Sequence, residues 1–179
     1  EQTTIKPGTS IPAAYLDYAE RFGYTSASLP LTFGWTRDSR DSVMVPTRGV
    51  MSRVYSDLAL AGDTHYTRSG AQYQQYFPLS KQYSFALNGE IGYGKGLSGH
   101  PYPIFKNYFV GGLGSVRGFD QGSLGPRDIT GLVIGGAKKI VMNAEVFAPF
   151  PGAGNDRTLR LYGFYDAGNV FGENDKFTL

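Results

Sequence analysis

Long runs that alternate apolar and polar residues limit the fold of this chain more than any other feature. The clearest run covers residues 83–93, and its apolar members are Tyr83, Phe85, Leu87, Ile91 and Tyr93. A period of two indicates a β-strand with one apolar face. Five further runs have the length of a strand, namely 27–36, 50–60, 65–77, 140–148 and 159–167. We therefore predict about six antiparallel strands of roughly 10–13 residues, joined as hairpins.

The length of these strands separates two classes of β-protein. Strands of soluble domains usually have about 5–6 residues, whereas tilted strands that cross a membrane need about 9–11. Charged residues make up 18% of the chain and aromatic residues 15%, yet the mean hydropathy is −0.26. Membrane strands hide their apolar content in this way, because lipid-facing and lumen-facing residues alternate. The expected fold class is all-β, an antiparallel transmembrane β-barrel. A soluble β-sandwich binding module is the alternative from another class.

The connections between the strands differ in length at the two ends of the sheet. Short turns are expected near 46–49, 78–81 and 150–156, whereas 95–137 forms a loop of more than 40 residues. Short periplasmic turns and long extracellular loops are typical of outer-membrane barrels. We therefore expect 95–137 to be a long extracellular loop and 1–26 to be a second one.

Local signals add three expectations to this outline. Tyr15, Tyr18 and Phe22 recur at helical spacing, which predicts one short helix within 1–26, with an irregular loop as an equal alternative. Pro30 lies inside the first alternating run and predicts an edge or a bulge there. A mixed charge cluster, expected to form a solvated or salt-bridged rim or else a docking surface for accessory subunits, consists of Arg37, Asp38, Arg40 and Asp41.

Six strands are too few to close a barrel, because outer-membrane barrels start at about eight. An open sheet in lipid would leave backbone donors and acceptors unpaired at both edges, at a cost of several kcal/mol for each group. The chain also starts at Glu1 without a signal peptide and stops at Leu179 in a loop-like segment. We therefore expect 1–179 to be one domain, a partial barrel. Its missing strands would come from elsewhere in a larger protein or from other copies of the chain.

The remaining residues give no sign of catalytic or metal chemistry. The chain has no cysteine, and its two histidines, His65 and His100, lack metal-ligand spacing with any other candidate. The glycine run 111–114 lacks the spacing of a dinucleotide fingerprint, and no helix pattern follows it. A net charge of +2 is too small to indicate nucleic acid. We expect no catalytic residue, no metal, no cofactor and no nucleic-acid partner.

The long loop contains the tetrapeptide Val116-Arg117-Gly118-Phe119, in which an arginine is flanked by apolar residues and a glycine. An arginine at a loop tip usually faces water, but these neighbours predict a tip that folds inward and docks. Gly118 would permit the tight bend that presents Arg117. Phe119 would then pack beside the arginine.

Two acids on the polar faces of neighbouring strands are the candidate partners of Arg117. The hairpin between 140–148 and 159–167 is expected to place Glu145 and Asp166 nearly opposite each other, where like charges destabilise a sheet. A cation between them would reverse the sign of this effect, and the planar fork of arginine can bind two carboxylates. The alternative is that both acids are solvated in the lumen and Arg117 is an exposed loop residue.

Four segments of the chain carry a resemblance to a known family. They are GWTRDSRDSVMVPTRG (34–49), PIFKNYFVGGLGSVRGFDQGSLGP (103–126), NAEVFAPFPG (143–152) and LYGFYDAGNVFG (161–172). In order and spacing they resemble the transmembrane region of the BamA family of outer-membrane protein assembly factors. The resemblance covers nearly the whole chain. Two-partner secretion transporters and the related translocation subunit TamA share the VRGF-like element, whereas FKNYFVGGLGS and DSVMVPTRG look more like the BamA family.

The resemblance implies a larger closed barrel preceded by periplasmic POTRA domains, of which this chain would hold the middle and later strands. It would lack the lateral gate between the first and last strands, so this piece alone should not perform the reaction. In the family the long extracellular loop folds back into the lumen, and its arginine docks on acids of the barrel wall. These residues map to Arg117, Glu145 and Asp166.

The implied function is that of the central subunit of a machine that folds and inserts β-barrel proteins into the Gram-negative outer membrane. The implied partners are outer-membrane lipid, client β-barrel proteins and, through the absent POTRA domains, accessory assembly lipoproteins. The implied location is the bacterial outer membrane. The pore of a related two-partner secretion or translocation protein is the alternative, and the number of POTRA domains in the parent chain would separate the two.

Overall fold

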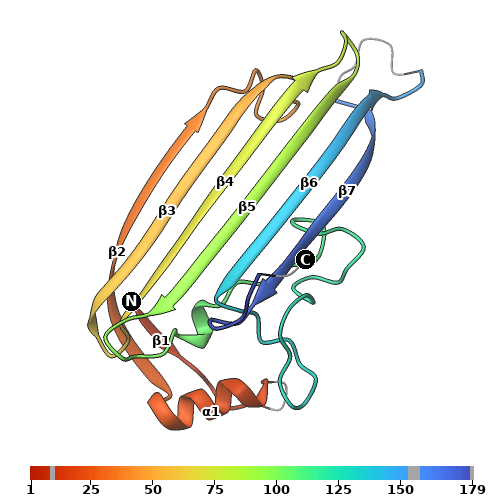
Figure 1. Cartoon of the computed structure of the whole chain (residues 1–179). Coiled ribbons are helices and arrows are strands. Elements are labelled where there is room, and N and C mark those ends of the chain that lie inside the picture. Colours follow the sequence, from red (N-terminus) through yellow and green to blue (C-terminus); the bar gives the residue numbers. More distant parts are fainter. Residues whose placement is uncertain (9–10, 153–157, 178–179) are drawn as a thin grey trace.

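The computed structural model describes residues 1–8, 11–152 and 158–177. These residues form one antiparallel sheet whose strands follow each other in sequence order (Figure 1). The elements are β1 (Gln2–Thr4), α1 (Ala13–Phe22), β2 (Thr25–Asp38), β3 (Gly49–Gly62), β4 (Tyr66–Pro78), β5 (Ser84–Gly96), the 3-10 helix η1 (Ile104–Lys106), β6 (Lys138–Pro149) and β7 (Arg160–Phe171). Each strand pairs with its neighbours in this order.

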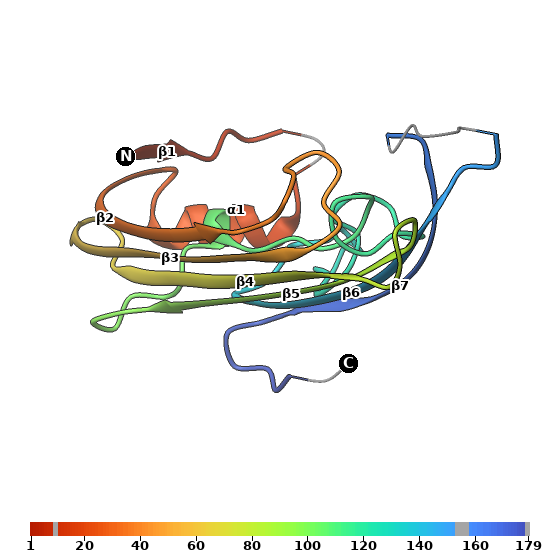
Figure 2. The same ribbon diagram turned by 90° about the horizontal axis from the view of Figure 1, so that it is seen from above.

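The six long strands confirm the predicted fold class. Strands β2 to β7 contain 12–14 residues each, which is enough for a tilted strand to cross a membrane. The sheet is curved like the wall of a barrel but is not closed (Figure 2). No second sheet packs against it among the described residues, so the β-sandwich alternative is wrong.

The start of the sheet differs from the prediction in one respect. Strand β1 lies in the segment 1–26, which was expected to be a loop, and it pairs Gln2 with Ala27 of β2. Three residues are too few to show a period of two.

The bulge predicted from Pro30 is confirmed, because the β2–β3 register shifts between Ser28 and Pro30. Proline has no N–H to donate to a ladder, so an irregular position near the start of β2 suits it.

The two faces of the sheet differ in chemistry, as the alternation predicts. The outward, convex face keeps large apolar side chains exposed on all six long strands, including Leu31, Phe33, Trp35, Val54, Leu60, Tyr73, Leu87, Ile91, Met142, Val146, Leu161 and Tyr165. A continuous exposed apolar surface of this extent indicates contact with lipid or with another apolar partner. Polar and charged side chains alternate with these residues and point to the concave side, where Asp57 lies near Arg68 and Lys139 pairs with Glu90.

The connections separate to the two ends of the sheet (Figure 1). The β2–β3 and β4–β5 connections and the C-terminal end of β6 lie at the upper end in this view, and the long β5–β6 loop lies at the lower end with α1. The first turn is longer than predicted, since β2 ends at Asp38 and β3 begins at Gly49. Residues 153–156 of the predicted turn 150–156 lie outside the described residues, as does Leu179.

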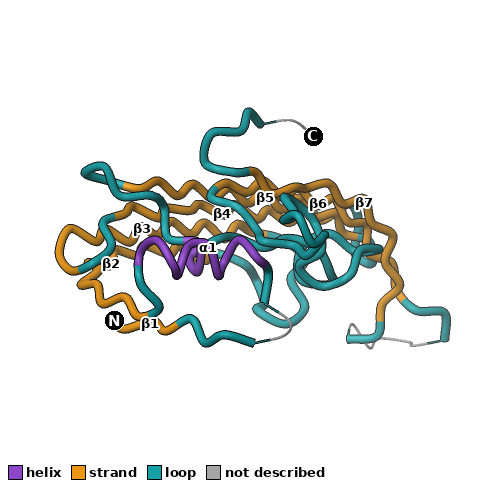
Figure 3. The backbone as a smooth tube through the Cα atoms, turned by 90° about the horizontal axis from the view of Figure 1, so that it is seen from below, coloured by secondary structure: helices purple, strands orange, loops and turns teal. Residues whose placement is uncertain are grey.

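The predicted helix is present as α1, and it packs against the long loop. The centre of its Tyr18 ring lies 4.9 Å from that of Phe22 and 6.2 Å from that of Phe105, the latter in an edge-to-face arrangement. The backbone N–H of Ala13 donates to Asp128 at 2.5 Å. Helix and loop therefore lie on the same side of the sheet (Figure 3). No helix among the described residues is long and apolar enough to cross a membrane.

The long loop, 97–137, packs on the concave side of the sheet through two buried clusters. The first consists of Ala59, Tyr66, Tyr102 and Ala137. The second consists of Val110, Val116, Val141 and Val170, with Leu124 beside it. Both clusters join loop residues to strand residues, so the loop is fixed against the wall and its tip lies over β6 and β7.

Candidate functional site

Strands β6 and β7 place both predicted acids on the concave face, but not opposite each other. Pro149 pairs with Arg160, so Asp166 lies opposite Asn143 and Glu145 lies opposite Phe164. The expectation that the two acids are nearly opposite is therefore wrong by two residues. They are diagonal neighbours, which lie about 7–8 Å apart on one face of a sheet. Their repulsion is weaker than for a facing pair, and the gap between them is wide enough for a guanidinium group.

Arg117 fills this gap and binds both acids. Its Nε donates to Asp166 Oδ2 at 2.7 Å and its Nη2 to Asp166 Oδ1 at 2.6 Å, which is the bidentate arrangement of an arginine on a carboxylate. The backbone N–H of Arg117 donates to Asp166 Oδ2 at 2.9 Å. Arg117 Nη1 lies 2.5 Å from Glu145 Oε1. We call these three residues the loop-to-wall clamp.

The aromatic rings beside Arg117 come from the wall and not from the loop. The guanidinium lies 3.9 Å from the centre of the Phe164 ring and 5.7 Å from that of Tyr162. Phe119, which was expected to pack beside Arg117, is 53% exposed. Phe164 takes this position because it lies opposite Glu145 on β7. A ring face under a cation adds an attraction of about 0.5–2 kcal/mol, depending on desolvation.

The rest of the tetrapeptide orients the tip. Val116 is 3% exposed and packs with Val110, Val141 and Val170, so the residue before the arginine is fixed in the wall. Gly118 has a φ of +88°, in the left-handed region that a β-carbon disfavours, as expected for a tight bend. The chain therefore enters the clamp from a buried valine and turns away directly after Arg117.

Asn143 is a member of the site that sequence reasoning did not find. Its Nδ2 donates to Asp166 Oδ1 at 2.8 Å and to the carbonyl oxygen of Ser115 in the loop at 2.7 Å. Its Oδ1 accepts from Asn88 at 2.8 Å, and Asn88 accepts from Gln72 at 3.0 Å. A chain of side-chain amides thus crosses β4, β5 and β6 and ends on Asp166. The available signal was the position of Asn143 on the same polar face as Glu145.

The clamp is mostly dry but has one wet side. The side chain of Asp166 is 2% exposed and that of Arg117 is 13% exposed, whereas that of Glu145 is 22% exposed. A polar cavity of about 180 Å³ beside Glu145 is also lined by Gln74, Asn88 and Ser115. Hydrogen bonds to Asp166, and then those to Glu145, raise the pKa of Arg117 above its ordinary value. The arginine therefore remains charged at every physiological pH.

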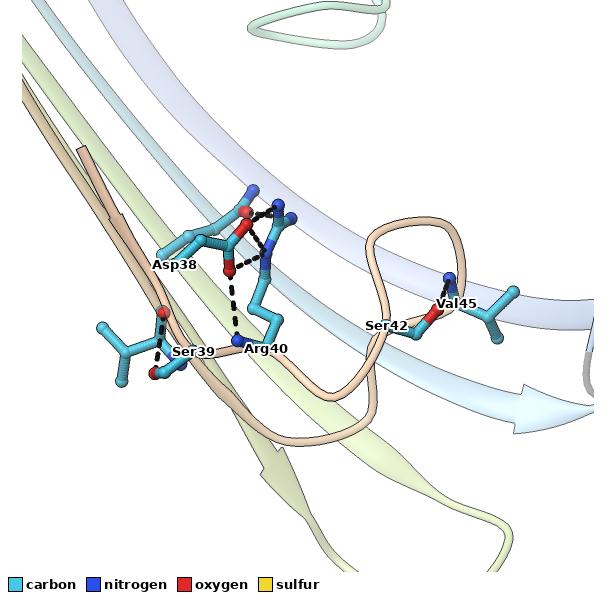
Figure 4. A network of polar contacts seen from close by, with 7 residues as sticks. Asp38, Ser39, Arg40, Ser42 and Val45 are labelled. Carbon is cyan, nitrogen blue, oxygen red and sulfur yellow. Dashed lines mark hydrogen bonds and ion pairs between the residues drawn. The ribbon is translucent and has the colours of Figure 1, made fainter.

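The expected salt-bridged rim is present at the C-terminal end of β2 (Figure 4). Arg40 Nη2 lies 2.6 Å from Asp38 Oδ2, and Arg40 Nη1 donates to Gln74 on β4 at 3.2 Å. Asp41 accepts from the hydroxyl of Thr47 at 2.5 Å and closes the turn. These contacts order the β2–β3 turn from within.

The remaining candidates form no metal centre within the part of the chain that the structure describes. The rings of His65 and His100 lie 4.6 Å apart. No group of three or more His, Cys, Asp or Glu residues is arranged to hold a metal ion in these described ranges. The geometry of the clamp supports binding and positioning of a loop.

Comparison with known proteins gives a consistent result. The family model described as the Omp85 superfamily domain matches residues 8–178. Outer membrane protein assembly factor BamA of Neisseria meningitidis is 38% identical over 96% of this chain and 23% of its own length. A SAM50-like protein of Schizosaccharomyces pombe is 30% identical over 78% of this chain and 30% of its own length.

A solved structure agrees with these sequence matches. The crystal structure of BamA from Haemophilus ducreyi lacking POTRA domains 1–3 aligns with 93% of this chain and 36% of that chain. The TM-score is 0.83 and the sequence identity is 26%. The chain thus spans between about a quarter and a third of the length of these relatives.

Proposed function

This chain belongs to the Omp85 superfamily, and we propose that it forms part of the barrel of an outer-membrane protein assembly factor. In this role it belongs to the central subunit of a machine that folds β-barrel proteins and inserts them into the Gram-negative outer membrane. The observation that carries the proposal is the loop-to-wall clamp, which holds a long loop inside a curved sheet of membrane length.

The clamp suits an assembly factor better than an open conduit. Arg117 joins β6 and β7 through a loop that covers their concave face, so it stiffens this part of the wall. In a secretion pore of the same superfamily the loop would line or clear the conduit, and clearing it would break the contacts of Arg117 with Asp166 and Glu145. Removing one partner of a buried pair costs up to about 3–5 kcal/mol. Because water would reach both carboxylates once the loop has left, the cost of clearing the loop lies below that range.

The proposed partners follow from the two faces of the sheet. The outward apolar face contacts the lipid of the bacterial outer membrane. Client β-barrel proteins meet the barrel elsewhere, at strands that this chain does not contribute. Accessory assembly lipoproteins bind through POTRA domains of the whole protein. The reaction involves no catalytic residue, because strand pairing and insertion require a template and an apolar surface instead of bond chemistry.

Reconstitution tests the proposal. The full-length protein would be placed in liposomes, and the folding of an unfolded client barrel would be followed by protease protection. We expect the client to fold faster than in protein-free liposomes. In Arg117→Ala we expect the rate of client folding to fall roughly tenfold or more, since a loss of about 1.4 kcal/mol or more of clamp interaction energy corresponds to this change.

Arg127→Ala is the matched control for this experiment. Arg127 lies in the same loop but donates to the main-chain oxygens of Gly131 and Ser123. It is expected to leave folding unchanged. A full-length protein that does not accelerate client folding, and that instead passes an unfolded polypeptide across the liposome, would overturn the assembly proposal in favour of the secretion pore.

A further inference from the structure

Strand β5 carries glycines at alternate positions on its concave face, and aromatic side chains of the long loop lie on them. A β-carbon added at Gly92 would lie 2.8 Å both from Cγ of Lys139 and from Cζ of Tyr108, and one added at Gly94 would overlap the ring of Tyr102. Glycine within a strand marks a place where another group approaches the backbone closely. Here the approaching groups are two tyrosines that precede the tip of the loop.

Both tyrosines are buried and bound. Tyr108 is 3% exposed, its hydroxyl donates to the carbonyl oxygen of Ser69 at 2.9 Å, and the guanidinium of Arg68 lies 4.3 Å above its ring. Tyr102 is 7% exposed, and its hydroxyl donates to the carbonyl oxygen of Lys106 at 2.8 Å. Burial raises the pKa of both hydroxyl groups, so they remain neutral donors.

The backbone supports the same attachment. The N–H of Tyr108 donates to Gly136 at 2.7 Å and its carbonyl oxygen accepts from Gly136 at 3.0 Å. The N–H of Gly94 donates to Ala137 at 2.6 Å. The loop backbone at Tyr108 is therefore joined to the end of the loop at Gly136, and this end is joined to β5.

This attachment shares no partner with the loop-to-wall clamp. The tyrosines contact β4, β5 and Lys139 of β6, whereas Arg117 contacts Glu145, Phe164 and Asp166. Between Tyr108 and Arg117 lie Gly111 and Gly112, with φ of +120° and +92°. Two adjacent glycines with positive φ give the backbone a point at which it can turn.

We propose that Tyr102 and Tyr108, resting on Gly92 and Gly94, form a second attachment of the long loop, the tyrosine anchor. It holds the base of the loop on the sheet through partners that Arg117 does not contact. The tip, 111–119, can therefore leave the wall while the base stays, once Val116 leaves the buried cluster that it shares with Val110. The tyrosine anchor adds positioning residues to the proposed function. Its test measures only where the loop lies, so a failure of the assembly proposal would leave the result intact.

Hydrogen exchange in the full-length protein tests the anchor. Peptides covering 104–110 report the base and peptides covering 113–119 report the tip. In the double variant Gly92→Ala with Gly94→Ala, the base is expected to exchange roughly tenfold faster or more, because the added methyl groups overpack the tyrosines. Gly89→Ala is the matched control, since a β-carbon on this β5 residue meets no atom within 4 Å.

Two further variants make the test decisive. Arg117→Ala is expected to accelerate exchange at the tip and to leave the base unchanged. Tyr108→Ala adds no atoms and is expected to accelerate exchange at the base. This variant replaces the glycine variants as the test if they do not fold. Adding Gly94→Ala to Tyr102→Ala should have little further effect, because the three atoms nearest to a β-carbon at Gly94 all belong to Tyr102 and the two residues act through one contact.

Either of two results would overturn the proposal. One is unchanged exchange at the base in Tyr108→Ala. The other is equal acceleration of base and tip in Arg117→Ala, which would mean that the clamp alone holds the whole loop.

Discussion

Asp166 holds Arg117 more firmly than Glu145 does. Asp166 accepts three hydrogen bonds from Arg117 and one from Asn143, and its side chain is almost fully buried. Glu145 meets Arg117 at one guanidinium nitrogen and lies beside a polar cavity. A buried carboxylate is costly unless its hydrogen bonds are made. We therefore expect the two acids to respond differently to substitution.

Asn143→Ala tests whether the amide chain positions Asp166. The change removes one donor from Asp166 and one from the carbonyl oxygen of Ser115. We expect the free energy of unfolding of the full-length protein to fall by about 1–2 kcal/mol, as for hydrogen bonds lost from buried partners. Urea unfolding would measure it. Asn169→Ala is the control, because Asn169 Oδ1 accepts from the N–H of its neighbour Val170. Equal effects of both variants would contradict the positioning role.

The sequence predicts the members of the clamp better than its geometry. The motif around Arg117 could be found from its residues and from the family resemblance, and the polar-face positions of Glu145 and Asp166 could be read from alternation. The pairing register could not, because it depends on where the β6–β7 turn closes, and a shift of two residues keeps the same face. For the same reason Asn143 and Phe164 could not be assigned as the neighbours of Asp166 and Arg117.

Among the elements, the β2–β3 turn is closed by a carboxylate, that of Asp41, which can be protonated. Asp41 accepts from the hydroxyl and the N–H of Thr47 and from the N–H of Arg48. The hydroxyl of Thr47, followed by the backbone N–H groups, lowers the pKa of Asp41 to about 2. Since the pKa of Asp41 is depressed in the folded state, its carboxylate stabilises the turn fully above the ordinary pKa of 3.8. This stabilisation is lost as the pH falls through about 2.

Thr47→Val should move this transition to higher pH. Loss of the hydroxyl is expected to raise the pKa of Asp41 toward 3.8, so the turn would open earlier on acidification. Amide NMR signals of Thr47 and Arg48 followed against pH would measure the midpoint. Ser42→Ala is the control, because Ser42 accepts from Val45 within the same turn. A midpoint that Thr47→Val leaves in place would be inconsistent with the closure.

The outward faces of the strands are predicted to tolerate charge poorly. Ile91 lies in the middle region of β5, is 56% exposed and faces outward. Ile91→Lys should destabilise the full-length protein in a bilayer by about 2–4 kcal/mol, the cost of a cation near the midplane. Urea titration in liposomes would measure it. Leu79→Lys is the control, because Leu79 is 60% exposed in the β4–β5 turn. Similar costs for both would argue against a membrane-facing sheet.

Alternation predicts long strands well and short elements poorly. The strands β2 to β7 could be placed because 12–14 residues give several repeats of the period. Strand β1 has three residues, and its pairing with β2 is set by the fold. The glycines of β5 were readable as a pattern, but the tyrosines that rest on them come from a distant loop, and no local signal joins the two.

For the whole molecule, the open sheet has a consequence for the isolated chain. In the described residues β7 pairs with β6 alone, and most of β2 pairs with β3 alone, so both edges carry unpaired backbone groups. Exposed edges of long strands pair with other chains. We expect the chain expressed by itself to associate or aggregate, as measured by light scattering after size exclusion. A stable monomer in plain buffer would speak against this account of its edges.

The most direct test of the central claim is a charge swap in the full-length protein, scored as assembly of a client barrel in liposomes. Arg117→Glu should impair assembly, and adding Glu145→Arg should restore part of it, because the wetter partner can accept the reversed pair. Asp166→Arg should not restore assembly, since that position is buried and receives a hydrogen bond from Asn143. Partial rescue at Glu145 alone is the predicted result. Normal assembly by Arg117→Glu itself would contradict the claim that the loop must be held on the wall.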